Sequence, residues 1–167
     1  MCRRGFVLLT GMTAEARRLI AALRLEPLPR EGGFFRQTWR SAAGSAIYFL
    51  MTAEDFSALH RLNTDELWHF YAGDAVEHVQ LDPHAAGEGS RVVRLGANVL
   101  SGEVPQLLVP AGMWQGARLA GTPVRGWSLL GCTLAPPWDD AGCALGDRLE
   151  LQRRFPAAAT IVRELTR

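Results

Sequence analysis

The feature that most constrains this fold is a run of short segments, bounded by turn residues, that fills the chain between Gly33 and Leu134. Gly, Pro, Asp and Asn interrupt the run at close intervals, for example at Gly44-Ser45 and Asn63-Thr64-Asp65. Many short strands with such spacing are typical of β-sandwiches and β-barrels. The expected strands are 34–40, 46–51, 56–62, 67–71, 75–81, 91–95, 106–109, 114–117 and 124–134.

Both ends of the chain are predicted to be helical. Thr13 is a suitable N-cap, and apolar residues recur at helical spacing over 16–23 before Pro27 ends the segment. In the tail, residues 148–164 again show helical spacing, and Pro156 is placed to begin a second helix. Because 167 residues fit one domain of ordinary size, we expect a single domain. It comprises an N-terminal helical segment (1–30), a barrel (33–135) and a C-terminal helical tail (145–167).

Composition excludes several classes of protein. A net charge of +1 gives no electrostatic basis for nucleic acid as the main ligand. The apolar run at 6–9 is shorter than the roughly 7–15 residues of a signal peptide, and no window approaches the ~20 apolar residues of a membrane span. We therefore expect a cytoplasmic protein that binds neither nucleic acid nor membrane. Its 3 cysteines, an odd number without a secretion signal, argue against a disulfide framework.

Residues 60–73, HRLNTDELWHFYAG, concentrate the candidate chemistry. One strand ends at His60 and Leu62, a polar turn follows, and the next strand opens with Glu66. Period-2 alternation places His60 and Leu62 on one face, and Glu66, Trp68 and Phe70 on one face of the second strand. A hairpin can direct both faces into the interior of one barrel, so His60 and Glu66 are predicted to share a pocket.

This segment resembles the first motif of the cupin superfamily, His-x-His followed by Glu and then Gly. A second cupin motif, Pro-x-Gly-x-x-His, is similar to PAGMWQ at 110–115. Further segments resemble the small stand-alone cupins of the cupin-5 type, called predicted sugar epimerases. They are EGGFFRQTW at 31–39, AIYFL at 46–50, FSALHR at 56–61, DELWHFYAG at 65–73, LG at 95–96 and GCTLAP at 131–136. The resemblance implies an all-β fold, a cupin jelly-roll (double-stranded β-helix) barrel with short N- and C-terminal helices.

The chain departs from the family pattern at the positions of two metal ligands. Leu62 stands where the second His of the first motif is usual, and Gln115 stands where the His of the second motif is usual. Leu has no donor atom and Gln is a poor neutral oxygen donor, so two good ligands remain. We therefore expect no cofactor and no tight metal site. If a divalent metal does bind, His60, Glu66 and Gln115 are its expected ligands.

An acid–base site needs fewer parts. Metal-independent cupin epimerases use a His base next to a carbonyl, and His60 occupies the first-His position. Glu66 is expected either to orient His60 or to act as the partner acid, and Tyr48 to donate to a developing oxyanion. The expected substrate-binding residues are Arg36, Trp68, Phe70, Trp114 and Gln115. The alternative for Glu66 is a purely structural hydrogen-bond network inside the barrel, and for the tryptophans a place in the core.

The function favoured by these residues is that of a small-molecule-binding cupin. It is expected to be a metal-independent isomerase, epimerase or lyase that uses His60 on a sugar-like substrate or an intermediate of specialised biosynthesis. Two alternatives remain open: a non-catalytic ligand-binding cupin, and a metal-dependent cupin oxygenase with an atypical ligand set. Small cupins of this kind usually pair, so the resemblance also implies a homodimer, with the odd-numbered residues of 67–71 at the covered surface.

Overall fold

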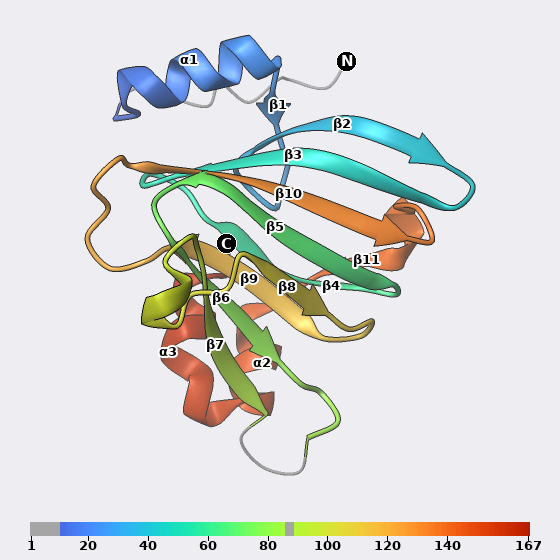
Figure 1. Ribbon diagram of the computed structural model, residues 1–167. Helices are drawn as coiled ribbons and strands as arrows, with labels where there is room; N and C mark the ends of the chain where they lie inside the picture. The colour runs from blue at the N-terminus through green and yellow to red at the C-terminus, as the bar shows by residue number, and fades with distance from the viewer. Residues whose placement is uncertain (1–10, 86–88) are drawn as a thin grey trace, which may run out of the picture.

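The chain forms two antiparallel β-sheets that face each other, with helices outside both (Figure 1). The computed structural model describes residues 11–85 and 89–167. The apolar run at 6–9 therefore lies outside the described residues. The six-stranded sheet has the order β1 (Glu26–Pro27), β2 (Phe34–Ser41), β3 (Gly44–Thr52), β10 (Trp127–Ala135), β5 (Asp65–Gly73) and β8 (Gln106–Val109). The five-stranded sheet has the order β11 (Cys143–Leu145), β4 (Ser57–Leu62), β9 (Trp114–Leu119), β6 (Val76–Leu81) and β7 (Ser90–Leu95). The expected all-β jelly-roll barrel is confirmed.

The helices lie at the two ends of the described chain. They are α1 (Ala14–Leu23), α2 (Arg148–Arg154) and α3 (Ala159–Glu164), with short 3₁₀ turns η1 (Val99–Ser101), η2 (Asp140–Gly142) and η3 (Pro156–Ala158). The Thr13 hydroxyl accepts the amide N–H of Ala16, as predicted for the N-cap of α1. Pro156 begins η3, which leads directly into α3. No helix among the described residues is long and apolar enough to cross a membrane.

Strand 124–134 was predicted too long at its start. β10 begins at Trp127, because the preceding backbone is held in a turn by Asp74. The Asp74 carboxylate accepts the amide N–H groups of Val124, Arg125 and Gly126. These donors are therefore unavailable to a strand partner. The two- and three-residue strands β1 and β11 were not predicted, since segments so short show no periodicity.

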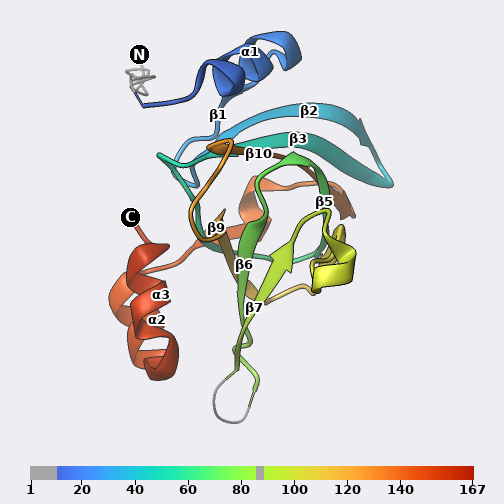
Figure 2. The ribbon, with the colours of Figure 1, turned by 60° about the vertical axis from the view of Figure 1, so that its left-hand side comes forward.

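Alternation along the strands separates an interior core from two outer layers. Side chains on the inner faces form a cluster between the sheets that includes Phe49, Trp68 and Leu130. The outer face of the five-stranded sheet packs against α2 and α3 through residues such as Leu59 and Val162 (Figure 2). The outer face of the six-stranded sheet packs against α1 along part of its width. One end of the interior is thus filled by apolar side chains, and the other end holds a cavity.

Candidate functional site

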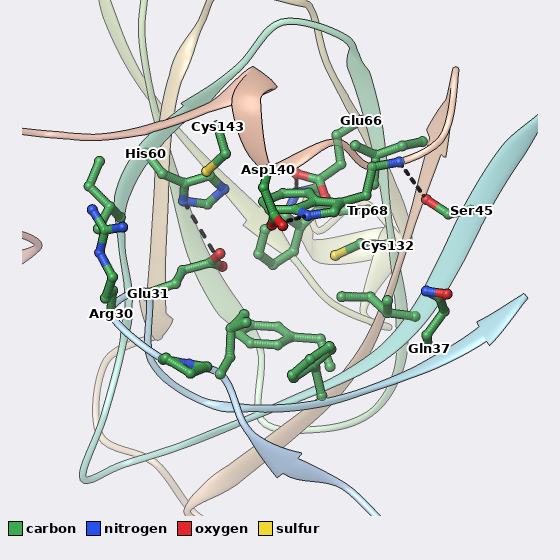
Figure 3. Close-up of a pocket in the computed structure, with 18 residues that line it drawn as sticks. Arg30, Glu31, Gln37, Ser45, His60, Glu66, Trp68, Cys132, Asp140 and Cys143 are labelled. Atoms are coloured by element: carbon green, nitrogen blue, oxygen red, sulfur yellow. Dashed lines mark hydrogen bonds and ion pairs between the residues drawn. The ribbon is translucent and has the colours of Figure 1, made fainter. Parts of the chain in front are cut away.

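A cavity of about 460 Å³ opens between the two sheets (Figure 3). Its walls come from the inner faces of β2, β3, β4, β5 and β10, from the loop before β2, and from β11 with the segment that precedes it. The lining residues are Leu28, Pro29, Arg30, Glu31, Phe35, Gln37, Ser45, Ile47, Phe49, His60, Glu66, Trp68, Cys132, Leu134, Trp138, Asp140, Cys143 and Leu145. The cavity brings together His60 and Glu66, the two residues on which the sequence-based site rests.

His60 is held in one orientation by its own strand. Its side chain lies on the inner face of β4 and the residue is 2 % exposed. The ring atom Nδ1 is 2.8 Å from the carbonyl oxygen of Ala58. A carbonyl only accepts hydrogen bonds, so Nδ1 carries the proton. In the neutral ring the lone pair is therefore on Nε2, and this ring lines the cavity.

Glu31 is the charged partner of His60, and no sequence pattern predicted this role. Its Oε1 atom lies 4.0 Å from His60 Nδ1 (Figure 3). The same oxygen accepts a hydrogen bond from the hydroxyl of Ser57 at 2.9 Å. At 4.0 Å the carboxylate does not share the Nδ1 proton of the neutral ring, but it stabilises a positive charge on the imidazole. The motif containing Glu31 was noted in the sequence, but the residue itself was given no role.

A tight turn at Gly32 places the Glu31 side chain in the cavity wall. Gly32 has φ +104°, and a Cβ there would lie 2.4 Å from the carbonyl oxygen of Phe56, so only glycine fits. The side chain of Arg167 donates to the carbonyl oxygens of Arg30 and Glu31, at 3.0 and 3.1 Å. The amide of Ala58 donates to the Glu31 carbonyl at 2.8 Å. The turn is therefore fixed to β4, the strand that carries His60.

Glu66 belongs to a hydrogen-bonded trio on the inner wall. Its Oε2 atom accepts from Trp68 Nε1 at 3.0 Å and from Gln115 Nε2 at 2.7 Å. Trp68 Nε1 also donates to Gln115 Oε1 at 3.0 Å. Burial raises the pKa of Glu66 and nearby Glu31 adds to the rise, while His60 and the two hydrogen bonds lower it. The structure gives no hydrogen bond between Glu66 and His60, so Glu66 acts on the histidine only through its charge, whereas Glu31 lies 4.0 Å from the ring atom Nδ1.

His78 is a second buried histidine on an inner face. It is 0 % exposed, and neither ring nitrogen has a hydrogen-bond partner within residues 11–85 and 89–167. Its ring meets that of Trp68 edge-on, with centroids 4.8 Å apart. Burial lowers the pKa of His78 to about 3, with a further lowering from His60, so the ring stays neutral.

Three expected site residues lie on the outer faces of their strands instead. Tyr48 and Arg36 pair across β2 and β3, and the Arg36 guanidinium lies over the Tyr48 ring. Their neighbours Phe35 and Phe49 face the cavity, so alternation turns Tyr48 and Arg36 away from it. Trp114 packs in the cluster with α2 and α3, as its neighbour Gln115 faces inward. The expected placement of Tyr48, Arg36 and Trp114 in the pocket is therefore corrected.

The remaining expected residues lie inside the barrel. Trp68 lines the cavity, and Gln115 bonds to Glu66 behind it. Phe70 packs against the interior core without lining the cavity. The odd-numbered residues of β5 face outward, where His69 stacks on Tyr71, and the homodimer that would cover them stays a prediction.

Two cysteines also line the cavity. Burial raises the pKa of Cys132, with further contributions from Glu66 and Glu31. Burial and the same two carboxyl groups raise the pKa of Cys143 to about 11. Both thiols are therefore protonated at neutral pH, and neither is an activated nucleophile.

Comparison with known proteins identifies the fold family. The profile of Cupin_5, Cupin superfamily (DUF985), matches residues 17–146. The structure of protein SO0799 from Shewanella oneidensis is 33% identical, covers 91% of this chain and 97% of its own, and has a TM-score of 0.82. A hypothetical protein from Leishmania major is 31% identical, with coverage of 92% and 98% and a TM-score of 0.82. The chain belongs to the DUF985 family of the cupin superfamily.

A more distant cupin shares only the fold. The cupin 2 domain-containing protein from Halorhodospira halophila is 15% identical, covers 84% of this chain and 86% of its own, and has a TM-score of 0.58. No curated protein matches this DUF985 cupin.

The residues at the superfamily's metal positions do not fit a transition-metal site in this DUF985 cupin. Leu62 offers no donor atom, and the Gln115 oxygen already accepts the N–H of Trp68. Glu66 Oε2 accepts two hydrogen bonds. Among the described residues, no group of three or more His, Cys, Asp or Glu side chains is arranged to hold a metal ion.

Proposed function

We propose that this protein binds a small organic molecule in the cavity and moves a proton on it with His60, as an isomerase, epimerase or lyase. One observation carries the proposal. The Nδ1–H of His60 is committed to the Ala58 carbonyl, which leaves Nε2 as the base of a ring that lines the cavity.

Glu31 supplies the charge that this step requires. When Nε2 takes a proton from the substrate, the imidazole becomes a cation inside a barrel of low polarity. The Glu31 carboxylate, 4.0 Å from Nδ1, stabilises that cation and does not compete for the Nδ1 proton held by Ala58. Glu31 therefore acts as a charge-compensating residue for His60.

Glu66 is suited to the opposite role. Burial raises its pKa, and in its protonated form the carboxyl group can donate a hydrogen bond to an oxygen that becomes negative as a carbon–hydrogen bond breaks. Two fixed donors, Trp68 and Gln115, hold its Oε2 atom in place. A histidine and a carboxyl group with a raised pKa thus line one cavity, a pairing suited to proton transfer next to a carbonyl.

A non-catalytic ligand-binding cupin is the second candidate. The observation that favours it is the closed trio of Glu66, Trp68 and Gln115, which satisfies Glu66 Oε2 with protein donors alone. In that case Glu66 stabilises the wall of the pocket and takes no part in a reaction.

Deuterium exchange separates the two candidates without knowledge of the substrate. The purified protein is incubated in D₂O with pools of small metabolites, and mass spectrometry identifies any compound that gains deuterium at carbon. We expect at least one such compound, with its exchange slowed about 100-fold or more in His60→Gln. His84→Gln, at an exposed histidine, is the matched control and should exchange at the native rate.

Two results would contradict the catalytic proposal. Compounds that bind but never exchange would favour the binding cupin. Exchange that persists at the native rate in a folded His60→Gln variant would remove His60 from the reaction.

A further inference from the structure

The charges inside the cavity are unequally distributed. Glu31 lies within it, with 14 % of its side chain exposed, beside the buried carboxyl group of Glu66, whose Oε2 atom is bonded to Trp68 and Gln115. The one lining arginine, Arg30, is exposed at the rim, as is Asp140. Solvent and salt screen both rim charges, whereas charges in the interior are screened much less.

Two arginines on strands that line the cavity, Arg36 and Arg61, are engaged elsewhere. Arg36 lies over Tyr48 on the outer face of the six-stranded sheet, 5.3 Å from the ring centroid. Arg61 lies over Trp114, 4.9 Å from its centroid, on the outer side of β4. Neither lines the cavity, so a carboxylate or phosphate would find no guanidinium clamp inside.

Gln37 and Ser45, which can donate hydrogen bonds, line the cavity from β2 and β3. Around His60, by contrast, the polar atoms that remain for a ligand are acceptors. The structure gives no hydrogen bond to Nε2 of His60 from any described residue, although the ring is almost fully buried and lines the cavity. Glu31 Oε1 accepts from Ser57, and no donor among the described residues bonds to its Oε2. The indole N–H of Trp68 is already taken by Glu66 and Gln115. A ligand that brings its own N–H donors complements this set.

Aromatic rings complete the walls. Phe35, Phe49, Trp68 and Trp138 line the same cavity as the carboxyl groups. Aromatic faces attract organic cations, and the attraction strengthens in partly desolvated sites. These rings also provide apolar surface for the carbon body of a ligand.

We propose that the cavity selects an organic ammonium ion with an apolar body, whose N–H groups bind Glu31 and whose carbon skeleton packs against the aromatic walls. The inference rests on the same cavity as the proposed function and names its substrate class: amines and amino compounds, in preference to carboxylates and phosphorylated sugars. A positive charge on the ligand compensates the negative charge of Glu31, which an anionic ligand would oppose.

Three probes that share a phenyl ring and a two-carbon chain test the charge preference. Binding of 2-phenylethylamine, 2-phenylethanol and phenylacetate to the full chain is measured by calorimetry near neutral pH, where the amine is protonated. We expect the amine to bind about tenfold more tightly than the alcohol, and phenylacetate most weakly. Phenylacetate binding as tightly as the amine, or equal affinities for all three, would overturn the proposal.

A pair of variants locates the preference. Glu31→Gln should reduce the advantage of the amine over the alcohol to about twofold or less, with the affinity for the alcohol unchanged. Glu26→Gln, at an exposed position that does not line the cavity, should keep the native ranking. A folded Glu31→Gln variant with the full amine preference would contradict the assignment. If this variant does not fold, the ranking by the native chain still decides.

The two proposals fail separately. Tightest binding of the neutral alcohol would overturn the charge preference and leave proton transfer by His60 standing. Amine-selective binding without deuterium exchange on any amine would overturn the catalytic proposal and leave the ligand class standing.

Discussion

His60 and His78 are both buried on inner faces of the five-stranded sheet, but their surroundings differ. His60 has a carbonyl acceptor at Nδ1, a carboxylate 4.0 Å away and a ring that lines the cavity. His78 has no hydrogen-bond partner among the described residues and packs edge-on against Trp68. Burial by itself therefore does not distinguish a candidate base from a neutral core residue. The partners of the ring and its access to the cavity do.

The same contrast separates two walls of the interior. The mouth wall, which consists of Glu31, Ser57 and His60, has a charged partner for its histidine. The inner wall, which consists of Glu66, Trp68, His78 and Gln115, holds its polar groups by hydrogen bonds within the wall or leaves them unpaired among the described residues. Changes in the inner wall are therefore expected to alter stability, and changes in the mouth wall to alter chemistry.

The largest effect is expected from His78 at acid pH. In the unfolded chain this histidine binds a proton below its ordinary pKa of 6.5, whereas the folded chain binds it only below about 3. Unfolding therefore takes up a proton between these values, so the contribution to stability is full above 6.5 and falls as the pH drops. His78→Leu lacks this loss. As the pH falls from about 6.5 to about 3.5, the free energy of unfolding of the variant should therefore increase by about 4 kcal/mol relative to that of the native chain.

Urea unfolding at a series of pH values measures this difference. His84→Leu, at an exposed histidine, should show the native pH dependence. If the free energy of unfolding depended on pH in the same way for the native chain and for His78→Leu, His78 would have a hydrogen-bond or charged partner. The contrast between His78 and His60 would then be wrong.

The hydrogen-bonded trio gives the next largest effect. Trp68→Phe keeps an aromatic ring but removes the N–H that bonds to Glu66 and Gln115. A buried acceptor then lacks its donor, and the free energy of unfolding should fall by about 2 kcal/mol. Trp138→Phe is the matched control, since the Trp138 N–H bonds to the exposed side chain of Asp140; its loss should cost less than about 0.5 kcal/mol. Equal costs in chemical denaturation would show that the trio is not a stabilising unit.

Glu66→Gln should have a smaller effect with the opposite dependence on pH. The folded pKa of Glu66 is raised above 4.5, so its contribution to stability is full below 4.5 and falls as the pH rises through the folded value. Gln keeps the shape and an acceptor for Trp68, and it does not ionise. The variant should therefore gain stability relative to the native chain as the pH rises from acid to neutral. Glu26→Gln, at an exposed position, serves as the control in the same thermal-unfolding series; a gain at acid pH instead would mean that Glu66 is ionised in the fold.

The smallest change in stability is expected in the mouth wall. In Glu31→Gln the amide oxygen can still accept from Ser57, so the cost should stay below about 1 kcal/mol. The His60 ring should keep its Nδ1–H tautomer, because the Ala58 carbonyl still holds that proton. The rate of His60-dependent deuterium exchange should nevertheless fall by about tenfold or more, as the imidazolium loses its compensating charge.

Nitrogen NMR of the His60 ring and the exchange assay provide the two readouts for this variant. A change of tautomer would show that Glu31, and not the Ala58 carbonyl, orients the ring. Full exchange activity would show that the reaction does not depend on the carboxylate.

The alternation of residues along a strand predicted which side chains of that strand share a face. Alternation placed His60 on an inner face and Glu66 with Trp68 on another, because side chains in one strand are tied to one another by the pleat. It did not assign Tyr48 and Arg36 correctly, since β2 and β3 have apolar residues on both faces. One face packs on α1 and the other lines the cavity, and both contain aromatic residues.

By itself, the sequence determined the strand run, the helices at both ends of the described chain and the loss of two metal ligands at Leu62 and Gln115. Only the tertiary structure decided that Glu31 faces His60. The turn that precedes β2 is held against β4 because the Glu31 carbonyl accepts hydrogen bonds from Ala58 and Arg167. These two residues belong to segments that are far from Glu31 in the sequence. Such contacts leave no local periodicity, because they arise when the two sheets close over one interior and the backbone groups of the turn must find partners.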